Sequence, residues 1–248
     1  MITIKRLTID IETRPNLAYV WRLWDQNVSL PALIESVDVL SFAAKWYGSK
    51  PIIFKSVYHD GEEAMIQAAY ELLDEADAVI HYNGKRFDTP HLNRKFLEVS
   101  MTPPSPFKEI DLLETVKKKF AFPSNKLEYV LKALGIGSKL KHEGFDMWVK
   151  CLAGDEKAWK TMKAYNIQDV RETEKLYDYL LPWIVGHPSF GAETGEDVCP
   201  TCGSSSLVRE GFAYTATGAF QRYHCADCGH WSRATKRSAG THITNVAS

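Results

Sequence analysis

Two carboxylates, Asp10 and Glu12, end an alternating, β-branched run near the N-terminus. Side chains of a strand alternate between its two faces, so both acids are expected on one face and Ile11 on the other. Two neighbouring carboxylates repel each other and are costly to remove from water, and a bound cation relieves both costs. Taken alone, however, such a pair is more often two solvated acids at an exposed strand end.

Two further acids lie in segments of different character. Asp88 follows a short strand-like run and precedes a helical run with Pro90 near its start, so it is either a metal ligand or the N-cap of that helix. Asp169 lies four residues after Tyr165 in a long helical run, which places both side chains on one helix face. Neither acid identifies a site by itself.

The elements that would position these acids alternate in the manner of a mixed α/β sheet covered by helices on its faces. The strands are expected at Thr3–Ile11, Ser36–Trp46, Ile52–Tyr58, Ala78–His81 and Ile110–Leu113. The helices are expected at Glu62–Ala76, Thr89–Val99, Leu127–Leu134, Phe145–Leu152 and Glu156–Leu181. The fold class is therefore α/β.

Four of the five cysteines form two Cys-x-x-Cys pairs, Cys199 with Cys202 and Cys225 with Cys228, and each pair is followed by glycine. Two strand-like runs lie between the pairs, at Leu207–Tyr214 and Phe220–His224. The arrangement resembles a zinc ribbon, in which each turn presents two thiolates to one ion. Four thiolates leave no open coordination position, so we expect one structural Zn²⁺ that stabilises the module.

In their order along the chain, the acidic segments resemble the three motifs of the DEDD superfamily of 3′→5′ exonucleases, which has a ribonuclease-H-like fold. The first motif matches Asp10-Ile11-Glu12-Thr13 and the second matches Asn83-x-x-x-Phe87-Asp88. Tyr165-x-x-x-Asp169 matches the third in its tyrosine (DEDDy) form, as in proofreading domains of family A and B DNA polymerases. Residues 126–136 are also similar to a segment that those domains carry between the second and third motifs.

This resemblance implies hydrolysis of phosphodiester bonds by two Mg²⁺ or Mn²⁺ ions, with release of nucleoside monophosphates. Asp10 would bridge the two ions, Glu12 and Asp169 would hold the ion that carries the nucleophilic water, and Asp88 would help to hold the other. Tyr165 would orient that water, because a phenol with an ordinary pKa of about 10 is a poor base at neutral pH. These five residues are the implied catalytic set.

Nucleic acid is the implied partner, with single-stranded 3′ ends as the expected substrate, and any proofreading would serve a polymerase or another replication or repair protein. Candidate contacts are Thr13, Asn83, Lys85, Arg86, Phe87, Arg222 and Arg233. For the charged residues near the second motif a solvated helix face is an equal alternative. The ribbon suits nucleic-acid binding, protein docking or simple stabilisation equally well. DNA and RNA are not distinguished, because the metal site acts on the phosphate.

Two other functions stay open at this point. One is a catalytically silent module that binds nucleic acid, and the other is a structure-specific endonuclease of the same fold. Retention of all four acids and the tyrosine argues against the silent module. The tyrosine form of the third motif favours the exonuclease over the endonuclease.

The segment Arg14–Glu35 departs from the family pattern because it is longer than a plain turn. Its Trp21 and Trp24 are three residues apart, which is typical of one face of a helix. We expect a buried helix face here, with an exposed platform for base stacking as the alternative.

The remaining features of the chain set its boundaries. The 248 residues carry a formal net charge of −1, so composition alone does not indicate a nucleic-acid binder. No apolar run approaches the roughly 18 to 20 residues that cross a bilayer, and the N-terminus lacks a signal-peptide layout, so an intracellular, cytoplasmic protein without membrane association is expected. The fifth cysteine, Cys151, is expected in the core. The expected domains are a ribonuclease-H-like domain (1–186), a linker (187–197), the zinc ribbon (198–234) and a disordered tail (235–248).

Overall fold

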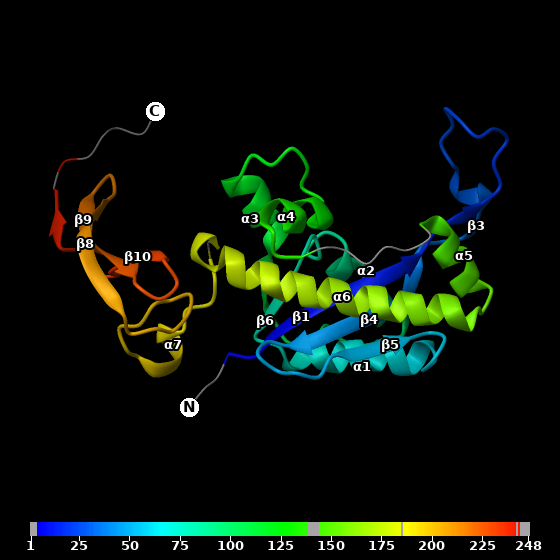
Figure 1. Ribbon diagram of the computed structural model, residues 1–248, viewed down its shortest axis with the longest axis horizontal. Coiled ribbons are helices and arrows are strands. Elements are labelled where there is room, and N and C mark those ends of the chain that lie inside the picture. The colour runs from blue at the N-terminus through cyan, green and yellow to red at the C-terminus, as the bar shows by residue number, and fades with distance from the viewer. Residues whose placement is uncertain (1–3, 138–143, 185, 242, 244–248) are drawn as a thin grey trace. The chain divides into compact units, whose positions relative to one another are not determined.

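The structure, a computed structural model, describes residues 4–137, 144–184, 186–241 and 243. It divides into two compact units, the first formed by Lys5–Leu176 and the second mainly by the described residues from Tyr177 onward (Figure 1). The boundary therefore lies within the last long helix, ten residues before the expected domain end at 186. None of the described helices combines the length and the apolar character that crossing a membrane requires.

The first unit is built on a five-stranded mixed sheet in the order β5-β4-β1-β6-β7 (Figure 1). Its strands are β1 (Arg6–Arg14), β4 (Asp38–Trp46), β5 (Ile53–Ser56), β6 (Ala78–His81) and β7 (Lys108–Asp111). The central strand β1 pairs antiparallel with β4 and parallel with β6. The predicted α/β fold with a mixed sheet flanked by helices is confirmed.

Helices cover the sheet on both faces. The helices of the first unit are α1 (Glu62–Glu75), α2 (Asp88–Glu98), α3 (Leu112–Lys119), α4 (Leu127–Leu134), α5 (Phe145–Leu152) and α6 (Glu156–Leu180). On one face, Leu7, Ile9 and Ile11 of β1 share a buried core with residues of α1 and α2, such as Met65 and Phe96. This core explains why the odd positions of β1 are apolar, because the strand turns every second side chain toward the same layer.

The opposite face of the sheet is covered by α5 and α6. A second buried cluster there joins Leu40 of β4 to Met147, Cys151 and Trp159. Cys151 is 2 % exposed, which confirms its expected place in the core. Polar side chains at the even positions of β1 face this layer, and α6 crosses over β1 and β4 in Figure 1. The sheet therefore presents its acids to α6.

Residues 17–35 form a projecting hairpin, and the expectation of a buried helix is wrong. The strands β2 (Leu17–Ala18) and β3 (Leu33–Glu35) pair antiparallel, with a short 3-10 turn at Leu30–Ala32. Trp21 is fully exposed and Trp24 is 79 % exposed. The hairpin continues from the end of the central strand β1 and projects away from the sheet (Figure 1).

The second unit contains the cysteine-bearing β module. Its strands are β8 (Leu207–Tyr214), β9 (Gly218–Cys225), β10 (Trp231–Arg233) and β11 (Ala239–Gly240), with β9 paired to the other three. The strand β11 lies inside the segment that was expected to be disordered. This expectation is wrong for residues 239–240, because their backbone pairs with β9. The expected linker likewise contains a helical turn, α7 (Gly191–Thr194).

Candidate active site

Three of the predicted carboxylates meet on the face of the sheet that α6 covers. Asp10 and Glu12 come from β1 and Asp169 comes from α6, and an oxygen of each lies within 4.8 Å of the others. The neighbouring Ile11 packs into the opposite core, so the predicted sharing of one face by Asp10 and Glu12 is confirmed. Three converging carboxylates provide the hard oxygen ligands that Mg²⁺ and Mn²⁺ prefer.

Asp88 is not one of the three converging carboxylates, but it contacts the strand that bears two of them. Its Oδ1 accepts a hydrogen bond of 2.9 Å from the backbone N–H of Ile11, the residue between Asp10 and Glu12. The alternative that Asp88 caps its helix is excluded, since α2 begins at Asp88 and no side chain caps it. Burial raises the pKa of Asp88 to about 7. The hydrogen bond from Ile11 lowers this pKa, whereas the negative charge of Asp111 raises it further. A nearby cation would favour the ionised form of this carboxyl.

Asn166 fixes the carboxylate of Asp10 and was not singled out by sequence reasoning. Its Nδ2 donates to Asp10 Oδ2 at 2.8 Å and to the Asp10 carbonyl oxygen at 3.1 Å. The Asn166 Oδ1 in turn accepts from Ser41 Oγ at 3.2 Å, and both Asn166 and Ser41 are fully buried. Its position between Tyr165 and Asp169, on the same helix turn, is the signal that could have identified it.

Asp111 holds the loop that leads to Asp88. It caps α3 by accepting from the N–H of Leu113, and it also accepts from the N–H of Asn83 at 2.8 Å. Asn83 has a φ of +71°, a left-handed conformation that asparagine tolerates better than most residues. The predicted contact residue Asn83 is thus a turn residue whose backbone is tied to the end of β7.

Tyr165 lies beside the carboxylates in a cavity of about 400 Å³ that is also lined by Asp10 and Asp169. Tyr165 is 8 % exposed, and its ring packs edge-on against Trp148. Lys126, at the start of α4, lines the same cavity. Lys126 begins the segment 126–136 that resembles part of the proofreading domains, but the sequence did not predict that its side chain would lie beside the carboxylates.

A groove of about 610 Å³ extends from Glu12 along residues 13–16 and contains two of the predicted nucleic-acid contacts, Thr13 and Phe87. Its walls include the aromatic side chains of Phe145 and Trp148. Of the other predicted contacts near the second motif, Lys85 forms an exposed ion pair with Glu114 and Arg86 is exposed. The structure therefore brings two predicted contacts to the carboxylates and leaves the basic ones on the loop surface.

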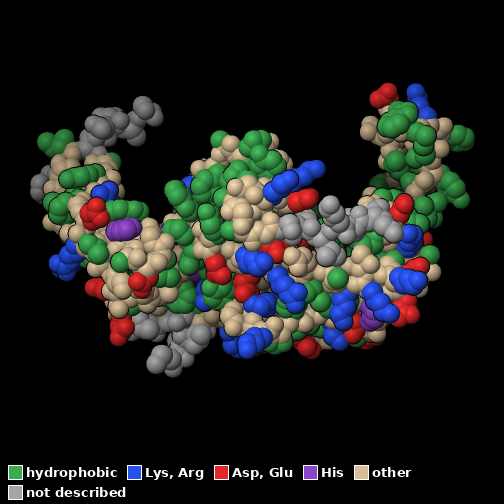
Figure 2. All heavy atoms as spheres, in the orientation of Figure 1, with side chains coloured by type: hydrophobic (Ala, Val, Ile, Leu, Met, Phe, Trp, Pro, Cys, Tyr) green, Lys and Arg blue, Asp and Glu red, His purple; other side chains and the backbone are tan. Residues whose placement is uncertain are grey.

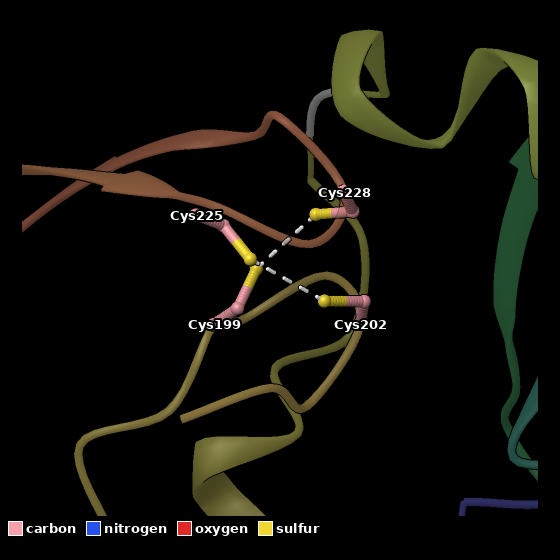
Figure 3. Close-up of side chains that lie close together, drawn as sticks. All are labelled: Cys199, Cys202, Cys225 and Cys228. Atoms are coloured by element: carbon pink, nitrogen blue, oxygen red, sulfur yellow. Dashed lines mark hydrogen bonds between the residues drawn. The ribbon is translucent and has the colours of Figure 1, made fainter. Parts of the chain in front are cut away.

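The four predicted cysteine ligands also meet, within the second unit (Figure 3). The Sγ atoms of Cys199 and Cys228 are 3.6 Å apart and those of Cys202 and Cys225 are 3.7 Å apart. A disulfide needs about 2.05 Å, whereas tetrahedral Zn²⁺ with Zn–S bonds of about 2.3 Å separates its ligands by about 3.8 Å. The donor set and its spacing fit Zn²⁺.

The two predicted contact arginines of this module lie over aromatic rings. The Arg222 guanidinium carbon is 4.6 Å from the ring centre of Trp231, and that of Arg233 is 4.1 Å from Phe220. Such stacking stabilises the strand surface. These contacts account for the mixture of basic and aromatic residues in the module without requiring a bound nucleic acid.

The protein is similar to known proteins in its fold and in its sequence family. The structure is similar to the family B DNA polymerase from the hyperthermophilic archaeon Pyrobaculum calidifontis, with a TM-score of 0.54 and 16 % sequence identity. The match covers 73 % of this chain and only 25 % of the polymerase chain, so it shows a shared fold. No curated protein sequence matches the chain. Residues 36–181, more than half of the chain, match the RNase_H superfamily. The chain belongs to the RNase_H superfamily.

Proposed function

We propose that the protein is a divalent-metal-dependent 3′→5′ exonuclease of the tyrosine branch of the DEDD superfamily. The observation that carries the proposal is the convergence of Asp10, Glu12 and Asp169 within 4.8 Å beside Tyr165. Membership of the RNase_H superfamily supports nuclease activity on nucleic acid. The direction of attack rests on the three ordered motifs.

Each side chain has a task that its surroundings support. Asp10, Glu12 and Asp169 would hold two Mg²⁺ or Mn²⁺ ions, and Asp88 would complete the set through a water. Bound there, the ions would stabilise the attacking and leaving oxygens of the phosphodiester. Tyr165 would orient the attacking water from within the shared cavity, while the groove beside Thr13 and Phe87 would receive the end of the strand.

For the second unit we propose one structural Zn²⁺ bound by Cys199, Cys202, Cys225 and Cys228. Closed coordination by four thiolates leaves no position for a substrate, so this ion would stabilise the module and take no part in hydrolysis. The separation of the two ligand types supports this division, because carboxylates suit Mg²⁺ and thiolates suit Zn²⁺.

The full-length protein should be assayed with Mg²⁺ or Mn²⁺ on single- and double-stranded DNA and RNA that carry a label at either end. We expect a 5′-labelled strand to shorten one nucleotide at a time and a 3′-labelled strand to release labelled mononucleotide at once. A strand that ends in a 3′-phosphorothioate linkage is the control and should be resistant. Internal cleavage would show an endonuclease instead, and binding without cleavage would show a silent binding module.

A further inference from the structure

The hairpin formed by residues 17–35, called the aromatic arm below, exposes an unusual amount of apolar surface. Tyr19 is 78 % exposed, Trp21 101 %, Leu23 83 % and Trp24 79 %. No residue of the arm is buried, and all of its residues are described. In Figure 2 the arm is the lobe at the upper right, covered mainly by hydrophobic side chains. Surface of this kind usually contacts another molecule.

The arm is tied down where it leaves the sheet. Asn16 Oδ1 accepts from the N–H of Val37 at 2.6 Å, and Arg14 and Glu35 form an ion pair across its base. Within the arm, the N–H of Tyr19 donates to the Ala32 carbonyl oxygen at 2.9 Å. The direction of the arm is therefore fixed relative to β1, the strand that bears Asp10 and Glu12.

The groove beside the carboxylates is continuous with the base of this arm. It is lined by residues 12–16, so it starts at Glu12 and ends where the arm begins at Leu17. The other walls include Phe87, Phe145 and Trp148, which continue the aromatic character of the arm. A polymer held at the carboxylates and leaving along this groove reaches the base of the arm, whose exposed aromatic residues are Tyr19, Trp21 and Trp24.

We propose that the aromatic arm binds the single-stranded part of the nucleic-acid substrate, with bases stacked on Tyr19, Trp21 and Trp24 some nucleotides away from the bond that is cut. This inference rests on the proposed function of the carboxylate site. Aromatic side chains stack with any base, so they hold a strand while its sequence changes. From Leu17 to Ile34 the charged residues are Arg22 and Asp25, so net charge contributes little to this contact.

The test compares Trp21→Ala/Trp24→Ala with Leu30→Ala, an exposed aliphatic residue of the same arm (84 %) without an aromatic face. Affinity for a fluorescent oligothymidylate of about 20 nucleotides, long enough to cover a site of the size typical for single strands, is measured by anisotropy. All proteins in this measurement carry Asp10→Asn and no Mg²⁺ or Mn²⁺ is added, so that no cleavage occurs and the zinc of the second unit stays bound. We expect the double variant to bind about tenfold or more weakly, since each lost stack weakens binding severalfold. Leu30→Ala should bind as the parent does, and Trp21→Phe/Trp24→Phe should recover most of the affinity.

Substrate length separates the arm from the catalytic site. A dinucleotide cannot reach both the carboxylates and the arm, so its hydrolysis rate should be the same in parent and double variant. Unchanged oligonucleotide affinity in the double variant would overturn the inference, as would an equal loss in Leu30→Ala. A parent dimer that becomes a monomer in the double variant would also overturn it, because the arm would then cover a second copy. Arm-dependent binding without hydrolysis would support the arm and reject the exonuclease.

Discussion

The carboxylate cluster and the cysteine cluster differ in how much of the structure exists without an ion. Asp10 and Glu12 lie on a strand whose other face packs into a core of Leu7, Ile9 and Ile11, each no more than 4 % exposed. In the cysteine module, the buried residues among those described from 186 onward are Cys199, Thr201 and Cys225. The first cluster is held by a core, and the second is nearly the whole core of its module.

This difference indicates what each ion would do. Removing an ion from the carboxylates would leave a folded sheet with repelling charges, and the hydrogen bond from Ile11 to Asp88 would remain. Removing an ion from the cysteines would leave four strands with almost no buried apolar surface, and small modules of this kind depend on their metal to fold. The ions at the carboxylates would serve chemistry, and the ion at the cysteines would serve stability.

The largest effect is expected from Cys199→Ser. Loss of one thiolate should release Zn²⁺ and abolish the strand pairing of β8–β11, while the unfolding temperature of the first unit stays unchanged. Metal analysis and the amide NMR signals of residues 207–240 measure the two effects. Cys151→Ala is the matched control and should keep the metal. Persistence of the native NMR signals in metal-free protein would contradict the comparison.

Asp10→Asn should abolish catalysis without destabilising the fold. We expect a loss of about a thousandfold in turnover, which corresponds to about 4 kcal/mol of lost transition-state stabilisation. The unfolding temperature without metal should not fall, because the change removes one of three converging charges. Single-turnover cleavage and thermal unfolding are the measurements, with Glu63→Gln on the far-side helix α1 as the control. Retention of most of the activity would exclude this cluster as the catalytic site.

Asn166→Ala should weaken metal binding at the carboxylates. Groups that orient a metal ligand typically change affinity by about 10- to 100-fold, and Asn166 holds both the carboxylate and the backbone of Asp10. Titration calorimetry with Mn²⁺ gives the affinity directly. Ser41→Ala removes only the donor to Asn166 and should have a smaller effect in the same direction. Unchanged Mn²⁺ affinity in Asn166→Ala would show that Asp10 is positioned by β1 alone.

Tyr165→Phe should have the smallest effect. Loss of one hydroxyl that orients water removes roughly 0.5–1.5 kcal/mol of transition-state stabilisation, which corresponds to about a 2- to 13-fold decrease in turnover. The affinity for Mn²⁺ should stay the same, in contrast to Asn166→Ala, because Mn²⁺ prefers carboxylate oxygens to a neutral phenol. A loss as large as that of Asp10→Asn would give Tyr165 a role as a base.

Much of the fold was predictable because the signals are local. The bounds of β6, α4, α5 and β8 agree with the predicted ranges at both ends, since each is a short periodic run between clear breakers. Asp10 and Glu12 face away from Ile11 because the side chains of a strand alternate between its two faces, which the sequence alone predicts. The cysteine spacing likewise predicted the meeting of four thiolates.

Other features depend on contacts between distant segments. Asp88 contacts Ile11 across 77 residues, and Asn166 reaches Asp10 across 156. No local pattern distinguishes a capping acid from one that accepts a hydrogen bond from a neighbouring strand. For the same reason the sequence predicted a buried helix at Trp21 and Trp24, whereas the structure exposes them.

By itself, then, the sequence predicted most strands and helices of the first unit, the shared face of Asp10 and Glu12 and the meeting of the four cysteines, because these follow from chain periodicity and spacing. The resemblance to the exonuclease motifs added Asp88 and Asp169 as candidate ligands. Only the tertiary structure decided which groups support those ligands and which apolar residues stay exposed. Burial and hydrogen bonding of a side chain depend on the surface that another segment brings to it. The carboxylates of β1 meet Asp169 because α6 crosses the sheet, and the aromatic arm stays open because none of the described helices of the first unit covers it.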